Sequence, residues 1–126
     1  ASAAGVHASL LGGGFSNDAT GDEYVDIENL VGSNFNDLLF GDSNANKLEG
    51  LGGNDTLDGG AGGNILDGGA GNDQLRSGKD ADQLIGGAHV ASGDGAGDTA
   101  SYGNSDAAVT VNLSQQGTGF NATTGK

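Results

Sequence analysis

Residues 50–75 read GLGGNDTLDGGAGGNILDGGAGNDQL, and a leucine returns at every ninth position of this stretch. The spacing continues in both directions, through Leu30, Leu39, Leu48, Leu57, Leu66, Leu75 and Leu84. An Asp or Asn stands two residues before each leucine from Leu39 onward, at Asp37, Asn46, Asp55, Asn64, Asp73 and Asp82. Six nonapeptides therefore run from 32 to 85 without an insertion, which indicates a repeat architecture.

Each nonapeptide contains a turn and a short strand. A period of nine fits neither one long helix nor a simple alternating strand. The segment 59–64 is rich in glycine, which permits positive φ and allows backbones to approach closely. Ile65, Leu66 and Asp67 then form a predicted three-residue strand whose central side chain points inward. Because a strand must return on the opposite face of a thin roll, we expect two nonapeptides to close one lap.

Composition limits both the core and the partners. The chain of 126 residues has 27 glycines, 34% apolar residues, no cysteine and a net charge of −13. Low hydrophobicity with high net charge is typical of disordered chains, so something besides apolar bulk must stabilise a fold. The acidic balance also argues against nucleic acid and anionic membrane surfaces, which select basic patches. The composition favours cations as partners.

The repeat resembles a known family. The segment 68–76, GGAGNDQLR, matches every fixed position of G-G-x-G-x-D-x-U-x, the calcium-binding nonapeptide of the RTX (haemolysin-type) proteins. The resemblance implies an all-β, right-handed parallel β-roll, a solenoid that binds several Ca²⁺ ions. It also implies that each ion lies between two turns one lap apart. The earlier turn would give its second and fourth carbonyls, the later turn its first and third, and both turns their sixth side chain.

On one edge of the roll the sixth residue is aspartate three times in succession. Carried onto this chain, the resemblance implies a best site from Leu51, Gly53, Asp55, Gly68, Ala70 and Asp73. It implies a second site from Ser33, Phe35, Asp37, Gly50, Gly52 and Asp55. A third site, from Gly69, Gly71 and Asp73, needs a substitute carboxylate, for which Asp94 and Asp98 are the candidates.

The opposite edge carries less charge. One implied site there consists of Gly60, Gly62, Asn64, Ser77, Lys79 and Asp82, with a single sixth-position carboxylate. Another, from Asp42, Asn44, Asn46, Gly59, Ala61 and Asn64, has none at that position. An amide oxygen can bind Ca²⁺, but without the charge the attraction falls. We therefore predict tight ions on the 37/55/73 edge and weak or absent ions along 46/64.

The flanks give the expected domain organisation: an N-terminal capping segment 1–31, a roll 32–94 and a C-terminal flanking segment 95–126. Segments 6–10 (VHASL) and 107–113 (AAVTVNL) alternate as strands do, and solenoids need end caps. Residues 4–10 also resemble residues 107–113, which predicts neighbouring blocks of a longer array. The IEN segment at 27–29 resembles the block organisation of the adenylate cyclase toxins.

No combination of nucleophile, base and oxyanion donors is recognisable, so we predict no enzyme. The resemblance implies a secreted bacterial protein that leaves the cell by type I export and folds outside on binding calcium. We expect a monomer that acts as a folding and secretion scaffold without inserting into membranes. The alternative is an adhesin segment that binds carbohydrate or a host partner in a calcium-dependent way. The outward strand positions from Lys47 to Ile85 have no aromatic platform, which favours the scaffold.

Overall fold

The computed structural model describes residues 4–11, 13–16, 19–88, 97–102, 110–112 and 121–123, and the regular elements in these ranges are β-strands. The strands are β1 (His7–Ser9), β2 (Gly13–Ser16), β3 (Asn29–Val31), β4 (Leu38–Phe40), β5 (Lys47–Glu49), β6 (Thr56–Asp58), β7 (Ile65–Ala70), β8 (Gln74–Arg76), β9 (Gln83–Ala88), β10 (Thr99–Ser101), β11 (Thr110–Asn112) and β12 (Asn121–Thr123). Within the described ranges, no helix has the length and apolar character needed to span a bilayer.

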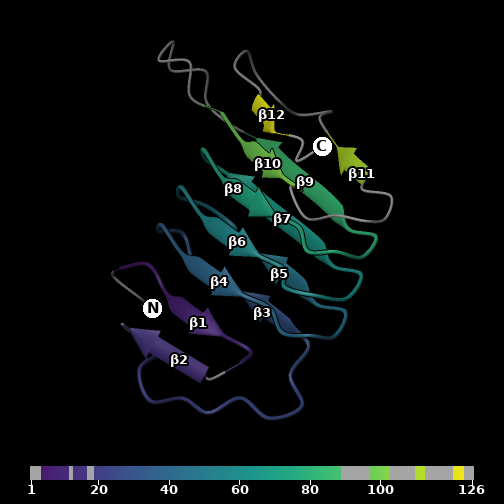
Figure 1. The fold of residues 1–126 in the computed structure, drawn as a ribbon. Helices are drawn as coiled ribbons and strands as arrows, with labels where there is room; N and C mark the ends of the chain where they lie inside the picture. The colour runs from purple at the N-terminus through teal and green to yellow at the C-terminus, as the bar shows by residue number, and fades with distance from the viewer. Residues whose placement is uncertain are drawn as a thin grey trace.

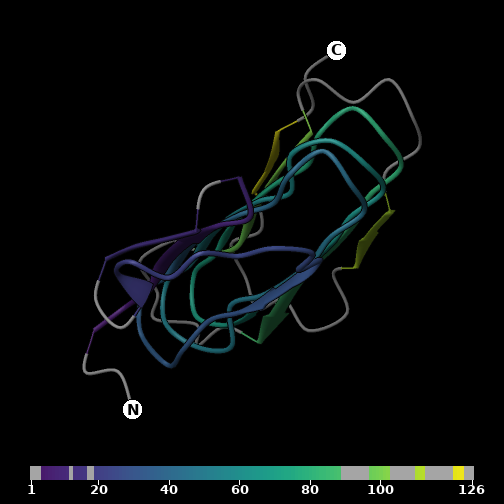
Figure 2. The same ribbon diagram turned by 90° about the horizontal axis from the view of Figure 1, so that it is seen from below.

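The strands form two sheets that face each other. One has seven strands in the order β12-β10-β8-β6-β4-β1-β2, and the other has five in the order β11-β9-β7-β5-β3. Successive strands of the repeat alternate between the sheets, so the chain coils upward as stacked laps (Figure 1). Figure 2 shows these laps as flattened loops lying over one another. The chain is therefore a parallel β-roll, as the repeat predicts.

The register between neighbouring strands confirms that two nonapeptides close one lap. Leu48 pairs with Leu66, and Leu66 with Leu84, each eighteen residues further along the chain. In the other sheet, Leu57 pairs in the same way with Leu75. Because paired strands share one register, equivalent positions of alternate repeats stack directly on each other. This register places the turn residues in rows along the two edges of the roll.

The core is a double row of leucines. Leu39, Leu48, Leu57, Leu66, Leu75 and Leu84 are between 0% and 2% exposed. Alanines continue the row at the ends of the seven-stranded sheet, where Ala8 pairs with Leu39 and Ala100 with Leu75. Each buried leucine contributes roughly 1.5–3 kcal/mol. Since each strand of the repeat buries one large side chain, the core is thin, and the edges must contribute to stability.

Two features differ in detail from the simple repeat. β7 and β9 are six residues long rather than three, because their pairing continues past the leucine through Gly69 with Gly87 and Ala70 with Ala88. The predicted N-terminal strand is β1, which joins the seven-stranded sheet beside β4 and turns back antiparallel as β2. This hairpin covers one end of that sheet. In the C-terminal flank, β11 lies within the predicted strand 107–113.

Candidate metal centre

The sixth residues of the repeats line the two edges of the roll and are buried. The aspartate edge consists of Asp37, Asp55, Asp73 and Asp98, and the asparagine edge consists of Asn46, Asn64 and Asp82. On the aspartate edge the exposed fractions are 3%, 1%, 0% and 1%, in chain order. Carboxylates are almost never buried to this degree unless they are paired or bind a cation. The aspartate edge therefore requires a compensating partner.

One oxygen of each carboxylate is satisfied by the backbone of the previous lap. The amide of Asp37 donates to Asp55 Oδ1 at 2.7 Å, and the amide of Asp55 to Asp73 Oδ1 at 2.8 Å. The amide of Asp73 donates to Asp98 Oδ1 at 2.9 Å, so Asp98 continues the row after a lap of 25 residues. At the other end, the amide of Val6 donates to Asp37 Oδ1 at 2.6 Å. Asp98 thus lies in this row where a substitute carboxylate is expected, while the other candidate, Asp94, lies outside the described residues.

On two of these aspartates the second carboxylate oxygen has no hydrogen-bond partner. Asp55 Oδ2 and Asp73 Oδ2 are buried and unpaired. Asp55 Oδ2 and the Gly68 carbonyl oxygen face the same space beside Gly50, where a Cβ atom would collide with both. The first-position glycine therefore keeps open a small space that is lined by oxygen atoms. Burying an unpaired carboxylate oxygen is costly, so this space suits a hard cation that prefers oxygen ligands.

Burial and mutual repulsion change the acidity of these groups. The pKa of Asp73 is raised to about 7, first by burial and also by the nearby charges of Asp55 and Asp98, while the hydrogen bond from the Asp55 amide lowers it. Burial likewise raises the pKa of Asp55 to about 6, with the charge of Asp37 adding to the shift. Two groups that resist ionisation next to each other gain most from a divalent cation between them.

The turns that would supply carbonyl ligands are stacked as the repeat predicts. The Leu51 carbonyl accepts a hydrogen bond from the Ala70 amide at 2.9 Å, and the Ala70 carbonyl one from the Gly53 amide at 2.9 Å. A Cβ atom at Gly71 would collide with the Gly53 carbonyl. A carbonyl oxygen has two lone pairs, so each keeps one for a further partner. The residues of the best predicted site therefore lie together: Leu51, Gly53, Asp55, Gly68, Ala70 and Asp73.

The second predicted site is also assembled but is more fully hydrogen-bonded. The Ser33 carbonyl accepts from the Gly52 amide at 3.2 Å, and Asp37 Oδ2 and the Gly50 carbonyl face the space beside Gly32. The Ser33 amide donates to Asp37 Oδ2 at 2.5 Å, and the Ser33 hydroxyl to Asp37 Oδ1 at 2.9 Å. The carboxylate of Asp37 is therefore satisfied, and Asp55 alone brings an unpaired oxygen. Phe35 belongs to this turn, and its carbonyl lies against Gly53.

For the third site, Gly69 and Gly71 lie against the turn of the next lap. A Cβ atom at Gly87 would collide with the Gly69 carbonyl, and the Gly71 amide donates to the Ala88 carbonyl at 3.1 Å. In the described part of the chain, no three acidic or histidine side chains converge as ligands. A ligand set of carbonyls with one or two carboxylates fits Ca²⁺, whereas zinc and other transition metals select nitrogen and sulfur.

On the asparagine edge, the side-chain amide of Asn64 donates to carbonyls of its own turn. The amide nitrogen Nδ2 of Asn64 donates to the Gly62 carbonyl at 2.9 Å and to the Ala61 carbonyl at 3.2 Å. Nδ2 of Asn64 also lies beside Gly59, where the aspartate edge has an unpaired carboxylate oxygen. Since Gly62 is a predicted ligand, the side chain of Asn64 already donates a hydrogen bond to an oxygen that an ion would bind.

The remaining predicted residues of this edge have mixed surroundings. Asp82 Oδ1 accepts from the Asn64 amide at 2.8 Å, while Asp82 Oδ2 is unpaired and burial raises the pKa of Asp82. Ser77 is buried with an unpaired hydroxyl, and Lys79 is exposed. The Gly60 carbonyl lies against Gly78, so the two turns do stack. This edge therefore offers one unpaired carboxylate oxygen in the described residues, fewer than the aspartate edge.

One row of side chains was not singled out from the sequence. The Asn54 amide donates to Asn36 Oδ1 at 2.8 Å, and the Asn72 amide to Asn54 Oδ1 at 3.0 Å. These asparagines occupy the fifth position of alternate repeats, so their spacing of eighteen residues was a usable signal. They hold the stacked turns beside the carboxylates in register.

Stacked glycine turns, a lap of eighteen residues and a row of buried aspartates define a calcium-binding β-roll. The family described as "RTX calcium-binding nonapeptide repeat (4 copies)" matches residues 20–57, 31–66 and 58–88, which together cover more than half of the chain. The chain belongs to this family, which is a structural calcium-binding repeat and not a catalytic one, and Ca²⁺ is its expected ligand. Searches among curated proteins and among solved structures gave no match.

Proposed function

We propose that this chain is a calcium-operated folding module of a secreted bacterial protein, which acts as a folding and secretion scaffold. The observation that supports it is the row of buried aspartates, in which Asp55 and Asp73 each keep one oxygen without a partner. A fold that requires such groups is weak when they are ionised and have no cation between them. In a compartment poor in calcium the chain would stay unfolded, and outside the cell it would fold.

The metal and the fold are thermodynamically coupled in this proposal. An ion that binds the folded chain and not the unfolded chain stabilises the fold by about 2.7 kcal/mol when its concentration is one hundred times Kd. It also neutralises part of a net charge of −13, which opposes compaction. The contributions of several ions on one edge add together. Burial of the leucine core supplies the remaining stabilisation of the fold. Calcium binding and folding would then be a single cooperative transition.

The ligand sets support an uneven distribution of ions. The tightest site would use Asp55 and Asp73, the next Asp37 and Asp55, and a third Asp73 with Asp98. On the asparagine edge, the hydrogen bonds of Asn64 compete with an ion for the turn carbonyls. Ions there would be weak or absent, apart from any held by Asp82.

The test is far-ultraviolet circular dichroism of the purified chain, first in EDTA and then with increasing calcium. We expect a coil spectrum in EDTA and a cooperative change to a β spectrum at millimolar calcium. Magnesium is the control, because it demands a small octahedral shell and dehydrates reluctantly, so it should not replace calcium in turns of carbonyls. A β spectrum that is already complete in EDTA would contradict the proposal.

The proposal also assigns roles to the flanking segments and to the neighbouring blocks. The segment 32–94 would be the ion-binding roll, and 1–31 and 95–126 would cap it and join neighbouring blocks of the same kind. The hairpin of β1 and β2 supports the capping role, since it covers one end of the seven-stranded sheet. The chain would act as a monomer without catalytic activity, and sedimentation equilibrium in calcium should give the mass of one chain.

A further inference from the structure

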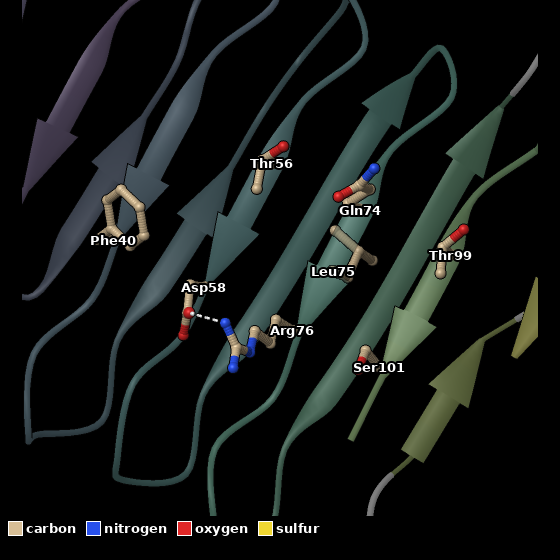
Figure 3. A pocket seen from close by; sticks show the side chains of 8 residues that line it. All are labelled: Phe40, Thr56, Asp58, Gln74, Leu75, Arg76, Thr99 and Ser101. Carbon is tan, nitrogen blue, oxygen red and sulfur yellow. Dashed lines mark ion pairs between the residues drawn. The ribbon is translucent and has the colours of Figure 1, made fainter. Parts of the chain in front are cut away.

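A depression lies on the outer face of the seven-stranded sheet, and Figure 3 shows the side chains that line it. Its volume is about 440 Å³, and β4, β6, β8 and β10 contribute to it. The residues that line it are Phe40, Thr56, Asp58, Gln74, Leu75, Arg76, Thr99 and Ser101. This groove contains none of the residues assigned to the calcium sites.

The lining combines one aromatic ring with groups that donate and accept hydrogen bonds. Phe40 lies at one end, where its ring packs against His7 with centroids 5.9 Å apart. The lining also has three hydroxyls, the amide of Gln74 and the ion pair between Asp58 and Arg76. An apolar face with a few well-placed polar groups is the general composition of small-molecule sites. The ring of Phe40 can pack against C–H groups of a ligand, and the polar groups can form hydrogen bonds with its hydroxyls.

The ion pair leaves its groups available for a ligand. Arg76 Nη1 lies 3.5 Å from Asp58 Oδ2, and the side chain of Arg76 is 65% exposed (Figure 3). A carboxylate can accept from two neighbouring hydroxyls, and a guanidinium has five N–H donors in a fixed fork. A loose pair whose guanidinium is mostly exposed can therefore bind a polyhydroxyl ligand without losing a strong ion pair.

The charge and length of the groove narrow the ligand class. The net charge of its side chains is zero, because Arg76 balances Asp58, whereas the whole chain has a net charge of −13. The groove thus lacks the excess positive charge that an anion would select. It crosses four adjacent strands, so it is about 14 Å long. This length suits a short oligosaccharide better than a single sugar.

We propose that the groove between Phe40 and Thr99 binds a neutral oligosaccharide in the calcium-folded chain. The ring of Phe40 would stack on one sugar, and Asp58, Gln74 and Arg76 would hydrogen-bond its neighbours. This function goes beyond the folding scaffold proposed above. The outward strand positions from Lys47 to Ile85 do not include Phe40, so their lack of an aromatic platform argued against a saccharide site. Phe40 nevertheless ends β4 in the same way as Asp58 ends β6.

The experiment is a ¹⁵N–¹H correlation titration of the full chain in saturating calcium. The probes are cellotriose, maltotriose and chitotriose, which are neutral and differ in linkage and substituents. We expect at least one of them to give saturable shifts confined to β4, β6, β8 and β10. The absence of saturable shifts with all three, or shifts spread over both sheets, would overturn the proposal.

Glutamines at equivalent repeat positions provide a matched control. Gln74 and Gln83 both occupy the seventh position of a repeat and are both exposed, but they lie on opposite sheets. Gln74→Ala and Arg76→Gln should each weaken binding about tenfold, the effect of losing one hydrogen bond of ordinary strength. Gln83→Ala should leave binding unchanged. Equal losses from Gln74→Ala and Gln83→Ala would show that binding does not occur in the groove.

The saccharide test is independent of the scaffold proposal. Circular dichroism with and without calcium, measured on each variant, reports whether the roll forms. A chain that folds without calcium would contradict the folding proposal and still present the groove for titration. A chain that folds on calcium but binds none of the three probes would contradict the saccharide site alone.

Discussion

At the scale of single residues, the difference between an aspartate and an asparagine decides what each edge of the roll requires. Asp73 is 0% exposed and has an unpaired Oδ2, whereas Asn64 is 1% exposed and donates from its Nδ2 to two turn carbonyls. Both side chains accept the same backbone hydrogen bond through Oδ1. One atom, oxygen or nitrogen, therefore separates a turn that needs a cation from a turn that supplies its own donor.

Exchanging aspartate and asparagine at these positions should change the calcium concentration that folding requires. Asp73→Asn removes one unit charge from two adjoining sites, which costs on the order of 1–4 kcal/mol for charges about 4 Å apart. We expect the calcium midpoint of folding to rise at least about tenfold. The reverse change, Asn64→Asp, should add a calcium-dependent step and weaken any ion-free structure. Calcium-titrated circular dichroism measures both, and an unchanged midpoint in Asp73→Asn would contradict the assignment of the best site.

Leu51 is a second residue whose local conformation has a measurable consequence. Its φ is +78°, a conformation that costs roughly 1–2 kcal/mol for a residue with a Cβ atom. The equivalent residues Gly60 and Gly69 have φ of +74° and +96°. Leu51→Gly should therefore stabilise the calcium-bound roll by about 1 kcal/mol in urea unfolding. Leu51→Ala is the control, because it removes the exposed apolar side chain but keeps the strain; an equal gain in Ala would refute the conformational explanation.

At the scale of elements, the row of aspartates survives a break in the repeat. Between Asp73 and Asp98 the lap contains 25 residues, but the Asp73 amide still donates to Asp98 Oδ1 and β10 still pairs with β8. A longer connection adds only slowly to the entropy cost of closing a lap. The strand register, and not the sequence spacing, is what keeps the carboxylate in line.

If Asp98 belongs to a calcium site, its removal should delete one ion and leave the others. Asp98→Asn keeps the backbone hydrogen bond and removes the charge, so we expect one fewer Ca²⁺ per chain at saturation, with folding retained. Native mass spectrometry or a calorimetric titration gives the number of ions. Asp80→Asn is the matched control, since Asp80 is exposed and lies on the other edge. The same ion count in Asp98→Asn and in the parent chain would contradict a third site on the aspartate edge.

At the scale of the whole molecule, folding concentrates negative charge that the extended chain spreads out. The net charge is −13, and several carboxylates are buried in the roll. Burial raises the pKa of Asp73 to about 7 and that of Asp55 to about 6, from the ordinary aspartate value of 3.8. The ion-free fold therefore binds more protons than the unfolded chain between about pH 4 and 7.

The stability of the ion-free roll should consequently increase as the pH falls. Its contribution from these two groups is fully present below the unfolded pKa and is lost as the pH rises through about 6 and then 7. In EDTA we expect more β signal at pH 5 than at pH 8. With calcium the trend reverses, because protons compete for the same oxygens and raise the calcium midpoint at pH 5. The double variant Asp55→Asn, Asp73→Asn should lose most of the dependence in EDTA, and a β signal that grows from pH 5 to pH 8 in EDTA would contradict this assignment.

Much of the molecule follows from the repeat. The leucine spacing predicts which side chains form the core, and the spacing of eighteen residues predicts the pairing of strands, as Leu57 with Leu75 confirms. The turns predicted to face each other do so, because any strand pairing in this register stacks them. Calcium ligands are harder to predict from the sequence than core residues, because every residue type has the same backbone carbonyl. The groove around Phe40 was missed for a related reason: it is formed by four strands that are distant in sequence.

The period, the leucine core, the stacking of alternate repeats and the charge that favours a cation depend on residue types at fixed spacing, so they can be predicted before the fold is known. How the rows end and what each buried oxygen contacts depend on the tertiary structure. It placed Val6 before Asp37 and Asp98 after Asp73, across connections that do not keep the period. In the folded chain, Nδ2 of Asn64 donates to the turn carbonyls. Hydrogen bonds between laps depend on register and on which atom faces which, and those are properties of the folded chain.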